Sequence, residues 1–265
     1  MEENEPVKNI VVASDLSERS GPAVRRAVDL ARSNAAKLTV VHVVDAAMPE
    51  RMAEQVQQEA RTLLTREVTA AVDGHTVAYD IVVPIGDAIA EINDLLRSVE
   101  AELLVVGLHR RRIFLDHIKE TTMEHLVRAS HVPVLLVARE AEASYARVLA
   151  GVDLSAVCAA GLHRINEIAP KAEVAVFHAH EVSFRKEAER DYATWQAMHA
   201  LPDDLPEPIY VEARPGEALQ DVMAKEDYDL VVIGAHTRSN AGRYILGGFS
   251  SALIRNPPCD LLLAR

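Results

Sequence analysis

The residues of this chain best suited to chemistry lie in a glycine-containing stretch near its carboxyl terminus. An apolar run at residues 230–233 ends at Gly234, a polar loop follows, and Gly247 and Gly248 precede a segment with helical spacing. A helix beginning there directs unpaired backbone N–H groups toward the loop, and its dipole adds about half a positive charge. Because glycines let the backbone approach a ligand closely, the stretch predicts an anion site, most often for nucleotide phosphates.

The stretch is also the second occurrence of a repeat. Residues 102–110 match residues 229–238, and four other pairs of segments match in the same order. These pairs are residues 9–17 with 147–155, 37–44 with 172–179, 84–92 with 215–222, and 130–139 with 256–265. Five matched pairs in one order indicate two copies of one fold. We predict domains at residues 1–140 and 145–265, joined by a short acidic, alanine-rich linker.

Each copy alternates apolar runs with segments of helical spacing. In the first copy this predicts strands at residues 9–13, 37–44, 76–83, 103–106 and 134–138. It predicts helices at residues 18–33, 50–72, 87–98 and 122–130. The second copy repeats the pattern from residue 147. The alternation predicts the α/β class, with two tandem doubly wound, Rossmann-like domains, each a five-stranded parallel sheet with helices on both faces.

Ligands in such sheets bind at the carboxyl ends of the strands, where the strand order reverses. The residues of interest therefore follow strands one, two and four of each copy. Asp15 and Asp153 follow strand one, and both fit a helix N-cap because Asp-Leu-Ser precedes a helix in each copy. His42 and His178 lie at the end of strand two, and we interpret them as packed residues rather than catalysts.

Composition limits the classes of protein that the chain can represent. At 265 residues and a net charge of −12, it is disfavoured as a nonspecific binder of nucleic acid or anionic membrane. Its two cysteines lie in apolar patterns and are interpreted as reduced core residues. The amino-terminal segment is acidic and polar, unlike a signal peptide. Tyr192, Trp195 and Met198 recur at a spacing of three and are expected in the core or at a domain contact.

The loop spacing resembles the nucleotide motif of the universal stress protein family. That motif reads Gly, two residues, Gly, nine residues, Gly, then Ser or Thr. Here Gly234, Thr237, Gly247 and Gly248 stand at these four places. Thr237 replaces the second glycine and Gly248 replaces the hydroxyl residue, although Ser250 offers a hydroxyl two positions later. With the repeat, the resemblance extends from residue 9 to residue 265.

The resemblance implies a cytoplasmic, stress-induced regulatory protein that binds ATP or AMP, with or without Mg²⁺, rather than a metabolic enzyme. It implies that Asp153 hydrogen-bonds the adenine or ribose and that Ala179 packs on the base. The ligand and N-cap interpretations of Asp153 both stay open, whereas for Asp15 the N-cap is favoured. The implied nucleotide contacts are Val152, Asp153, Ala179, Gly234, His236, Thr237, Gly247, Gly248, Phe249 and Ser250.

The first copy departs further from this motif. Arg110 and Glu120 replace its second and third glycines. Glu120 would repel a phosphate by on the order of several kcal/mol once both groups are partly desolvated. Thr121 and Glu124 form a capping-box pattern, so this helix start is expected to satisfy its own N–H groups. We predict a nucleotide site in the second copy and a blocked or repurposed one in the first.

Three functions remain open. The first is an ATP or AMP sensor, favoured because the helix start at Gly247 and Gly248 carries no acid. The second is a nucleotide-independent interaction scaffold, favoured by the two departures from the motif. The third is a weak hydrolase, which lacks a Walker lysine and any evident general base except His236. No metal site is predicted, because the histidines at positions 109, 117, 125 and 131 lack the spacing of helical zinc ligands.

The resemblance also implies an assembly. Family members usually pair through the fifth strand, so residues 134–138 are expected to pair with residues 261–264 within one chain. This makes an internal pseudo-dimer, on top of which two chains form a homo-oligomer. A regulatory protein partner is expected as well, and the sequence does not identify it.

Overall fold

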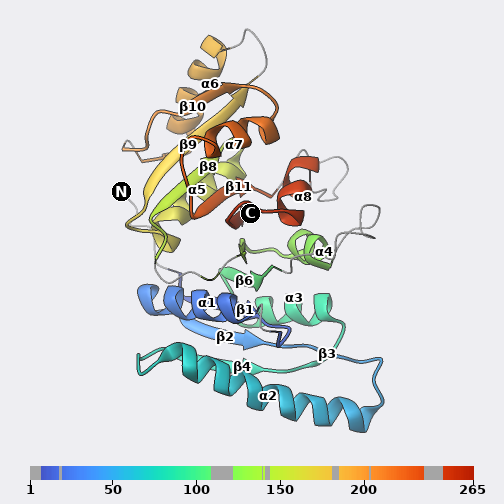
Figure 1. The fold of residues 1–265 in the computed structure, drawn as a ribbon. Helices are drawn as coiled ribbons and strands as arrows, with labels where there is room; N and C mark the ends of the chain where they lie inside the picture. Colours follow the sequence, from blue (N-terminus) through green and yellow to red (C-terminus); the bar gives the residue numbers. More distant parts are fainter. Residues whose placement is uncertain are drawn as a thin grey trace. The chain divides into compact units, whose positions relative to one another are not determined.

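The computed structural model describes residues 7–17, 20–108, 122–138, 140, 144–180, 185–202, 204–235 and 247–265. The chain divides into two compact units, Met1–Glu142 and Ala143–Arg265 (Figure 1). Each unit contains one copy of the repeat and builds its own layered α/β structure.

Five parallel strands form the main sheet of the first unit. They are β1 (Asn9–Ala13), β2 (Lys37–Val41), β4 (Tyr79–Val82), β6 (Leu103–Gly107) and β7 (Val134–Val137). Within this unit their order is β7-β6-β1-β2-β4, and every adjacent pair is parallel. The central strands are rich in valine and leucine because both faces of a parallel sheet are covered by helices. The predicted fold class is confirmed, with the order reversing between β1 and β6.

Four helices cover this sheet: α1 (Gly21–Asn34), α2 (Glu50–Val72), α3 (Ala88–Ser98) and α4 (Thr122–Ala129). Helix α1 packs against α2, and α3 packs against α4, which gives two helix pairs. The long helix α2 buries one stripe, Ala53, Ala60, Leu64 and Val68, whose spacing matches one helical face.

The predicted second strand at residues 37–44 is wrong in its last part. Strand β2 ends at Val41, and a separate two-stranded sheet follows, made of β3 (Val44–Asp45) and β5 (Ile85–Gly86). The N–H of Val44 donates to the carbonyl of Pro84 over 2.9 Å. Since proline has no N–H to return a bond, the ladder between the two segments is interrupted at Pro84 and resumes only as the short β3–β5 pair.

The second unit repeats the architecture. Its strands are β8 (Arg147–Gly151), β9 (Glu173–His180), β10 (Ile209–Glu212), β11 (Leu230–Gly234) and β12 (Asp260–Ala264), in the order β10-β9-β8-β11-β12. Its helices are α5 (Ala156–Ile168), α6 (Arg185–Met198), α7 (Pro215–Met223) and α8 (Gly248–Arg255). Helix α5 packs closely on the sheet because Gly161 has no side chain. A Cβ at Gly161 would lie 3.0 Å from the Cβ of Ala264.

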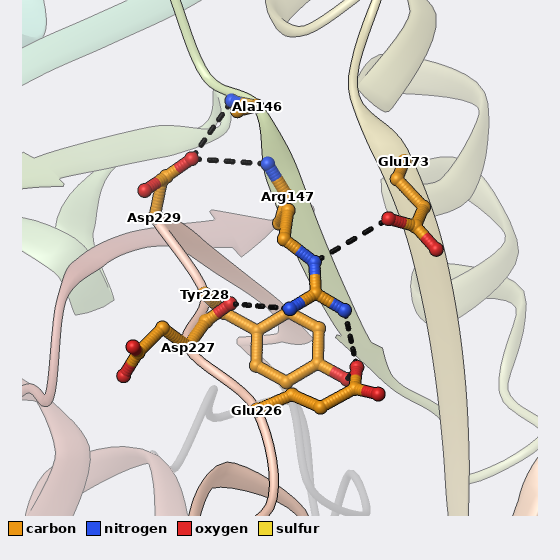
Figure 2. A network of polar contacts seen from close by, with 7 residues as sticks. All are labelled: Ala146, Arg147, Glu173, Glu226, Asp227, Tyr228 and Asp229. Atoms are coloured by element: carbon orange, nitrogen blue, oxygen red, sulfur yellow. Dashed lines mark hydrogen bonds and ion pairs between the residues drawn. The ribbon is translucent and has the colours of Figure 1, made fainter.

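Each sheet fixes the start of its first strand with a carboxylate from the start of its fourth. In the second unit Asp229 Oδ2 accepts from the N–H of Ala146 over 2.8 Å and from the N–H of Arg147 over 3.0 Å (Figure 2). In the first unit Glu102 accepts from the N–H groups of residues 8 and 9 in the same way. The repeat therefore extends to individual hydrogen bonds.

The side chain of Arg147 joins three segments at this same end of the second sheet. Its guanidinium contacts Glu226, lies 3.4 Å from Glu173, and stacks over the ring of Tyr228 at 5.2 Å (Figure 2). This network lies at the amino end of β8, so it supports the fold at the end opposite to the predicted site.

The predicted core residues of α6 divide into two groups. Tyr192 and Trp195 are buried, as expected, with their rings 5.5 Å apart. Met198 is 73% exposed, so of the two expectations, core or domain contact, the core is wrong for it: it lies in the last turn of α6, beyond the buried stripe. Among the described residues, no helix is both long and apolar enough to cross a lipid bilayer.

Candidate functional site

The candidate site lies where the carboxyl ends of β8, β9 and β11 come together in the second unit. Strand β8 pairs with β9 on one side and β11 on the other, so the strand order reverses beside β8. This is the place where doubly wound sheets leave room for a ligand. Asp153 lies in the loop after β8, Ala179 near the end of β9 and Gly234 at the end of β11. All three are residues predicted from sequence.

The loop after β8 presents Asp153 in a fixed conformation. The N–H of Val152 donates to the carbonyl of Phe177 over 3.0 Å, and Val152 is buried. Asp153 is exposed, and its Oδ1 accepts from the N–H of Ser155 over 3.1 Å. Leu154 between them has a φ of 59°, in the left-handed region that a leucine rarely adopts. Backbone strain of this kind persists where surrounding contacts hold the loop in place.

The N-cap of α5 is Ser155, not Asp153. The Ser155 hydroxyl accepts from the N–H of Cys158 over 3.2 Å, the bond that defines an N-cap. The N-cap interpretation of Asp153 is therefore wrong, because the helix begins at Ala156, three residues after it. Asp153 instead closes an Asx turn that leads into the helix. Its carboxylate stays at the surface of the loop.

Two contacts from outside the loop support this conformation. The indole N–H of Trp195 donates to the carbonyl of Ser155 over 3.0 Å. Nδ1 of His178 lies 2.9 Å from the carbonyl oxygen of Val152, so this histidine is a packed residue, as expected. Sequence analysis missed the role of Trp195, because no local pattern pairs a residue in α6 with the start of α5.

The end of β9 differs from its prediction in extent. The strand continues to His180, so Ala179 lies inside it, opposite Val211 of β10. Ala179 is half-buried. In the first repeat the corresponding strand stops at Val41, two residues before the equivalent position, Val43.

Gly234 ends β11 against the start of α5. A Cβ at Gly234 would lie 3.2 Å from Sγ of Cys158, so a side chain there would press on the thiol. The N–H of Ala235 then donates to the carbonyl of Ala264 over 2.9 Å. His236 and Thr237, both predicted site residues, lie outside the described residues.

Helix α8 begins with Gly247 as its N-cap, at φ −65° and ψ 156°. Within the described residues no side chain caps this helix start, and its first turn contains no acid. Gly248 is exposed with open space around its Cα, and Phe249 is half-buried, its ring near Gly216 of α7. The first N–H groups of α8 have no partner within the helix and are suited to an anion.

Ser250, which the sequence offers as a substitute for the motif hydroxyl, is buried in the structure. It is 2% exposed, and its Oγ lies 3.4 Å from the carbonyl oxygen of Gly234. The hydroxyl therefore joins the start of α8 to the end of β11.

Cys158 lies beneath the site, and sequence analysis treated it only as a core residue. Its Sγ donates to Asp153 Oδ1 over 3.0 Å. Burial, with the negative charge of Asp153 beside it, raises the pKa of the Cys158 thiol to about 12. The thiol thus stays protonated at neutral pH.

The equivalent loop of the first repeat has similar bonds but another neighbour. Asp15 Oδ1 accepts from the N–H and the hydroxyl of Ser17. The N-cap of α1 is Ser20, so the N-cap prediction for Asp15 is wrong. Glu67 of α2 reaches this place: burial raises the pKa of its carboxyl, Arg25 lowers that pKa, and Asp15 raises it further.

Other first-repeat predictions fall partly outside the description. Arg110, Glu120 and Thr121 lie outside the described residues, whereas Glu124 of the expected capping box is buried in α4. Within the part of the chain that the structure describes, no three His, Cys, Asp or Glu side chains gather as a metal site.

The fold is thus a tandem of two doubly wound domains. Where the strand order reverses in the second domain lie the acid Asp153 and the start of α8, which no described side chain caps. The chain belongs to the universal stress protein family, whose model matches residues 6–138 and again residues 144–265. A comparison with curated proteins finds no match.

Solved structures support the same fold. A universal stress protein from Archaeoglobus fulgidus is 17% identical with a TM-score of 0.77, covering 100% of this chain and 99% of that chain. A functionally unknown protein from Pseudomonas aeruginosa is 18% identical with a TM-score of 0.70, covering 98% and 93%. A universal stress protein solved in complex with cAMP is 23% identical over 50% of this chain and 98% of that chain. Its TM-score of 0.40 carries no argument for this chain.

Proposed function

We propose that the second repeat binds an adenine nucleotide, ATP or AMP, and that the protein is a regulatory nucleotide-binding member of its family. The phosphates would lie at the start of α8, and the ribose or adenine at Asp153. Mg²⁺ would accompany ATP through its phosphates. No catalytic step is proposed, because the described part of the site offers no base aimed at a phosphate.

The observation that carries this proposal is the combination of an acid-free helix start with a presented carboxylate. Gly247 begins α8 without a side-chain cap among the described residues. The hydroxyl of Ser250 joins that helix start to Gly234, whose Cα lies against Cys158 and hence close to Asp153. Positive potential for phosphate and an acceptor for a hydroxyl or amine are thus offered by neighbouring segments.

The test is nucleotide content and affinity. The purified protein is denatured, and the released small molecules are identified by mass spectrometry and absorbance. The emptied protein is then titrated calorimetrically with ATP, AMP and ADP, with and without Mg²⁺. One nucleotide per chain supports the proposal, two per chain contradict the blocked first repeat, and none overturns the proposal.

The fluorescence of Trp195 provides a second test of nucleotide binding, local to the loop that carries Asp153. Trp195 is the sole tryptophan of the chain, and its indole N–H bonds to this loop. A ligand at Asp153 should therefore change the intrinsic fluorescence. Binding heat without any fluorescence change would place the nucleotide away from this loop.

A second function, an interaction scaffold that needs no nucleotide, is favoured by one observation. Ser250 is the residue that could replace the missing motif hydroxyl, and it is buried against Gly234. If titration shows no nucleotide binding, protein partners captured by cross-linking in stressed and resting cells become the test of this alternative.

The assembly also stays a proposal. Residues 134–138 are expected to pair with residues 261–264 as an internal pseudo-dimer, and two chains to associate further. Hydrogen exchange tests the pairing, because β7 and β12 would each exchange along one edge unless another strand covers it. Sedimentation of the full chain tests the homo-oligomer.

A further inference from the structure

We infer that Cys158 is a positioning residue of the second-repeat site: its thiol holds Asp153 so that Oδ2 of the carboxylate faces a hydrogen-bond donor of the ligand. This inference rests on the proposed nucleotide function and adds which ligand groups the site selects. A nucleotide offers such an oxygen two kinds of donor, the two ribose hydroxyls and the adenine amine.

The geometry begins with the position of the thiol. Cys158 is in the first turn of α5 and is 5% exposed. Its Sγ lies 3.0 Å from Asp153 Oδ1 and 3.7 Å from the carbonyl oxygen of Gly151. Gly234 leaves room for it, since a Cβ there would lie 3.2 Å from the sulfur. The thiol thus sits between the ends of β8 and β11 and touches the carboxylate from below.

The chemistry of this contact is hydrogen bonding and not nucleophilic attack. The raised pKa of Cys158, about 12, keeps the thiol protonated at neutral pH. A protonated thiol is a weak donor, and the carboxylate is the charged acceptor that makes the bond stronger. Reaction with electrophiles is disfavoured because the thiolate is the reactive form.

Two donors on one oxygen determine how the carboxylate is presented. Both the N–H of Ser155 and the thiol of Cys158 bond to Asp153 Oδ1. Among the described residues, Oδ2 of this exposed side chain receives no hydrogen bond. Oδ2 is therefore held in one orientation before a ligand arrives. A ligand that supplies a hydrogen-bond donor to Oδ2 binds more tightly.

The first repeat does not have this arrangement. Ser20 is five residues after Asp15, as Cys158 is five residues after Asp153. The hydroxyl of Ser20 lies 2.8 Å from that of Ser14, while Asp15 bonds to both the N–H and the hydroxyl of Ser17. The positioning contact thus belongs to the repeat whose helix start lacks an acid.

The test compares two substitutions in the full chain by calorimetric titration with ATP. Cys158→Ala removes the donor and should weaken ATP binding about five-fold, the effect of roughly one hydrogen bond. Cys158→Ser keeps a donor at the same place and should bind within about two-fold of wild type. Thermal unfolding of both variants checks that the fold is retained.

Ligand analogues separate positioning from a general structural defect. The titrations are repeated with 2′-deoxyATP, 3′-deoxyATP and ITP, which lack one ribose hydroxyl, the other hydroxyl, and the adenine amine. The effect of Cys158→Ala should vanish for the analogue that lacks the donor to Oδ2. It should also vanish in an Asp153→Ala background.

Each outcome decides the inference. Equal weakening by Cys158→Ala for ATP and all three analogues would assign a structural role to the cysteine and overturn it. Wild-type affinity in Cys158→Ala would overturn it while leaving the nucleotide function intact. No binding by wild type at any concentration would overturn the proposed function and this inference together.

Discussion

The two repeats leave their first strands in the same way and then diverge within a few residues. In both, Asp-Leu-Ser follows the strand, and the leucine adopts a left-handed φ, 61° at Leu16 and 59° at Leu154. In both, a histidine in or directly after the second strand contacts the backbone carbonyl just before the aspartate, over 2.9 Å. Yet α5 begins at Ala156, three residues after its aspartate, whereas α1 begins at Gly21, six residues after.

The neighbours of the two loops differ more than the loops themselves. In the first repeat Glu67 of α2 is near enough to Asp15 for the charge of that aspartate to raise the pKa of the Glu67 carboxyl. In the second repeat Trp195 of α6 reaches the matching loop with a neutral donor. Thus the second helix of each repeat gives its loop a different neighbour, an acid in the first and a neutral donor in the second, although the loop sequences are nearly the same.

The substitution expected to remove the difference between the two repeats most strongly lies at the start of α8. Gly247→Glu gives the second repeat the acid of the first, and its carboxylate would oppose phosphate by on the order of several kcal/mol. Nucleotide binding should fall by about 100-fold or more. Calorimetric titration measures this, with circular dichroism as a check on the fold.

The matched control is Ala252→Glu, which adds the same charge at an exposed position further along α8. It should bind within a few-fold of wild type, because the first turn is where the N–H groups and the dipole act. Unaltered binding in Gly247→Glu would mean that the phosphates lie elsewhere.

The two aspartates should differ next most strongly. Asp153→Ala removes a charged acceptor and should weaken nucleotide binding by about 10-fold to 100-fold. Asp15→Ala should leave binding unchanged, because its repeat is expected to hold no nucleotide. Side-by-side titrations measure both, and equal losses in the two variants would show that the repeats are not functionally distinct.

Much of the fold could be predicted because its signals are local. Parallel strands covered on both faces need runs of branched apolar residues, so the strand at residues 9–13 was predicted with its observed bounds. The same holds for the helix at residues 50–72, whose buried stripe has helical spacing. The strand at residues 37–44 was overextended because the residue that ends its ladder, Pro84, is far away in sequence.

The candidate site was less predictable because its decisive contacts are tertiary. The sequence placed Asp153 and the glycines at strand ends, which follows from the topology alone. It could not show that Cys158 bonds to Asp153, or that Glu67 approaches Asp15, since these contacts depend on helix packing. It also favoured Asp15 as an N-cap and left that interpretation open for Asp153, whereas the N-caps are Ser20 and Ser155.

A smaller effect is expected at a feature that the two repeats share, the carboxylate that bonds to the start of the first strand. Asp229→Ala in the second unit and Glu102→Ala in the first each remove the acceptor of two backbone N–H groups. Each should lower the free energy of unfolding by about 1–2 kcal/mol, limited because water reaches these groups. Urea unfolding measures both variants. A large loss in one and none in the other would contradict the shared role of the two carboxylates.

The smallest effect concerns the titration of Cys158, for which the first repeat has a serine in the matching place. The thiol pKa is raised from 9.0 to about 12 in the folded protein. Below pH 9 the Cys158 thiol is protonated in both the folded and the unfolded state, so its full contribution to the free energy of unfolding is present. As pH rises from about 9 toward 12, the unfolded thiol ionises first, and the free energy of unfolding falls.

Between pH 8 and pH 10, ionisation of Cys158 in the unfolded state should lower the free energy of unfolding of wild type by about 1 kcal/mol. Cys158→Ser should show no such decrease, because its hydroxyl does not titrate. Tyrosines with raised pKa values, Tyr192, Tyr210 and Tyr228, contribute equally to both proteins and cancel in the difference. Urea unfolding at the two pH values gives that difference. Parallel declines in wild type and variant would mean that Cys158 ionises as easily folded as unfolded, and that its contact with Asp153 does not hold the proton.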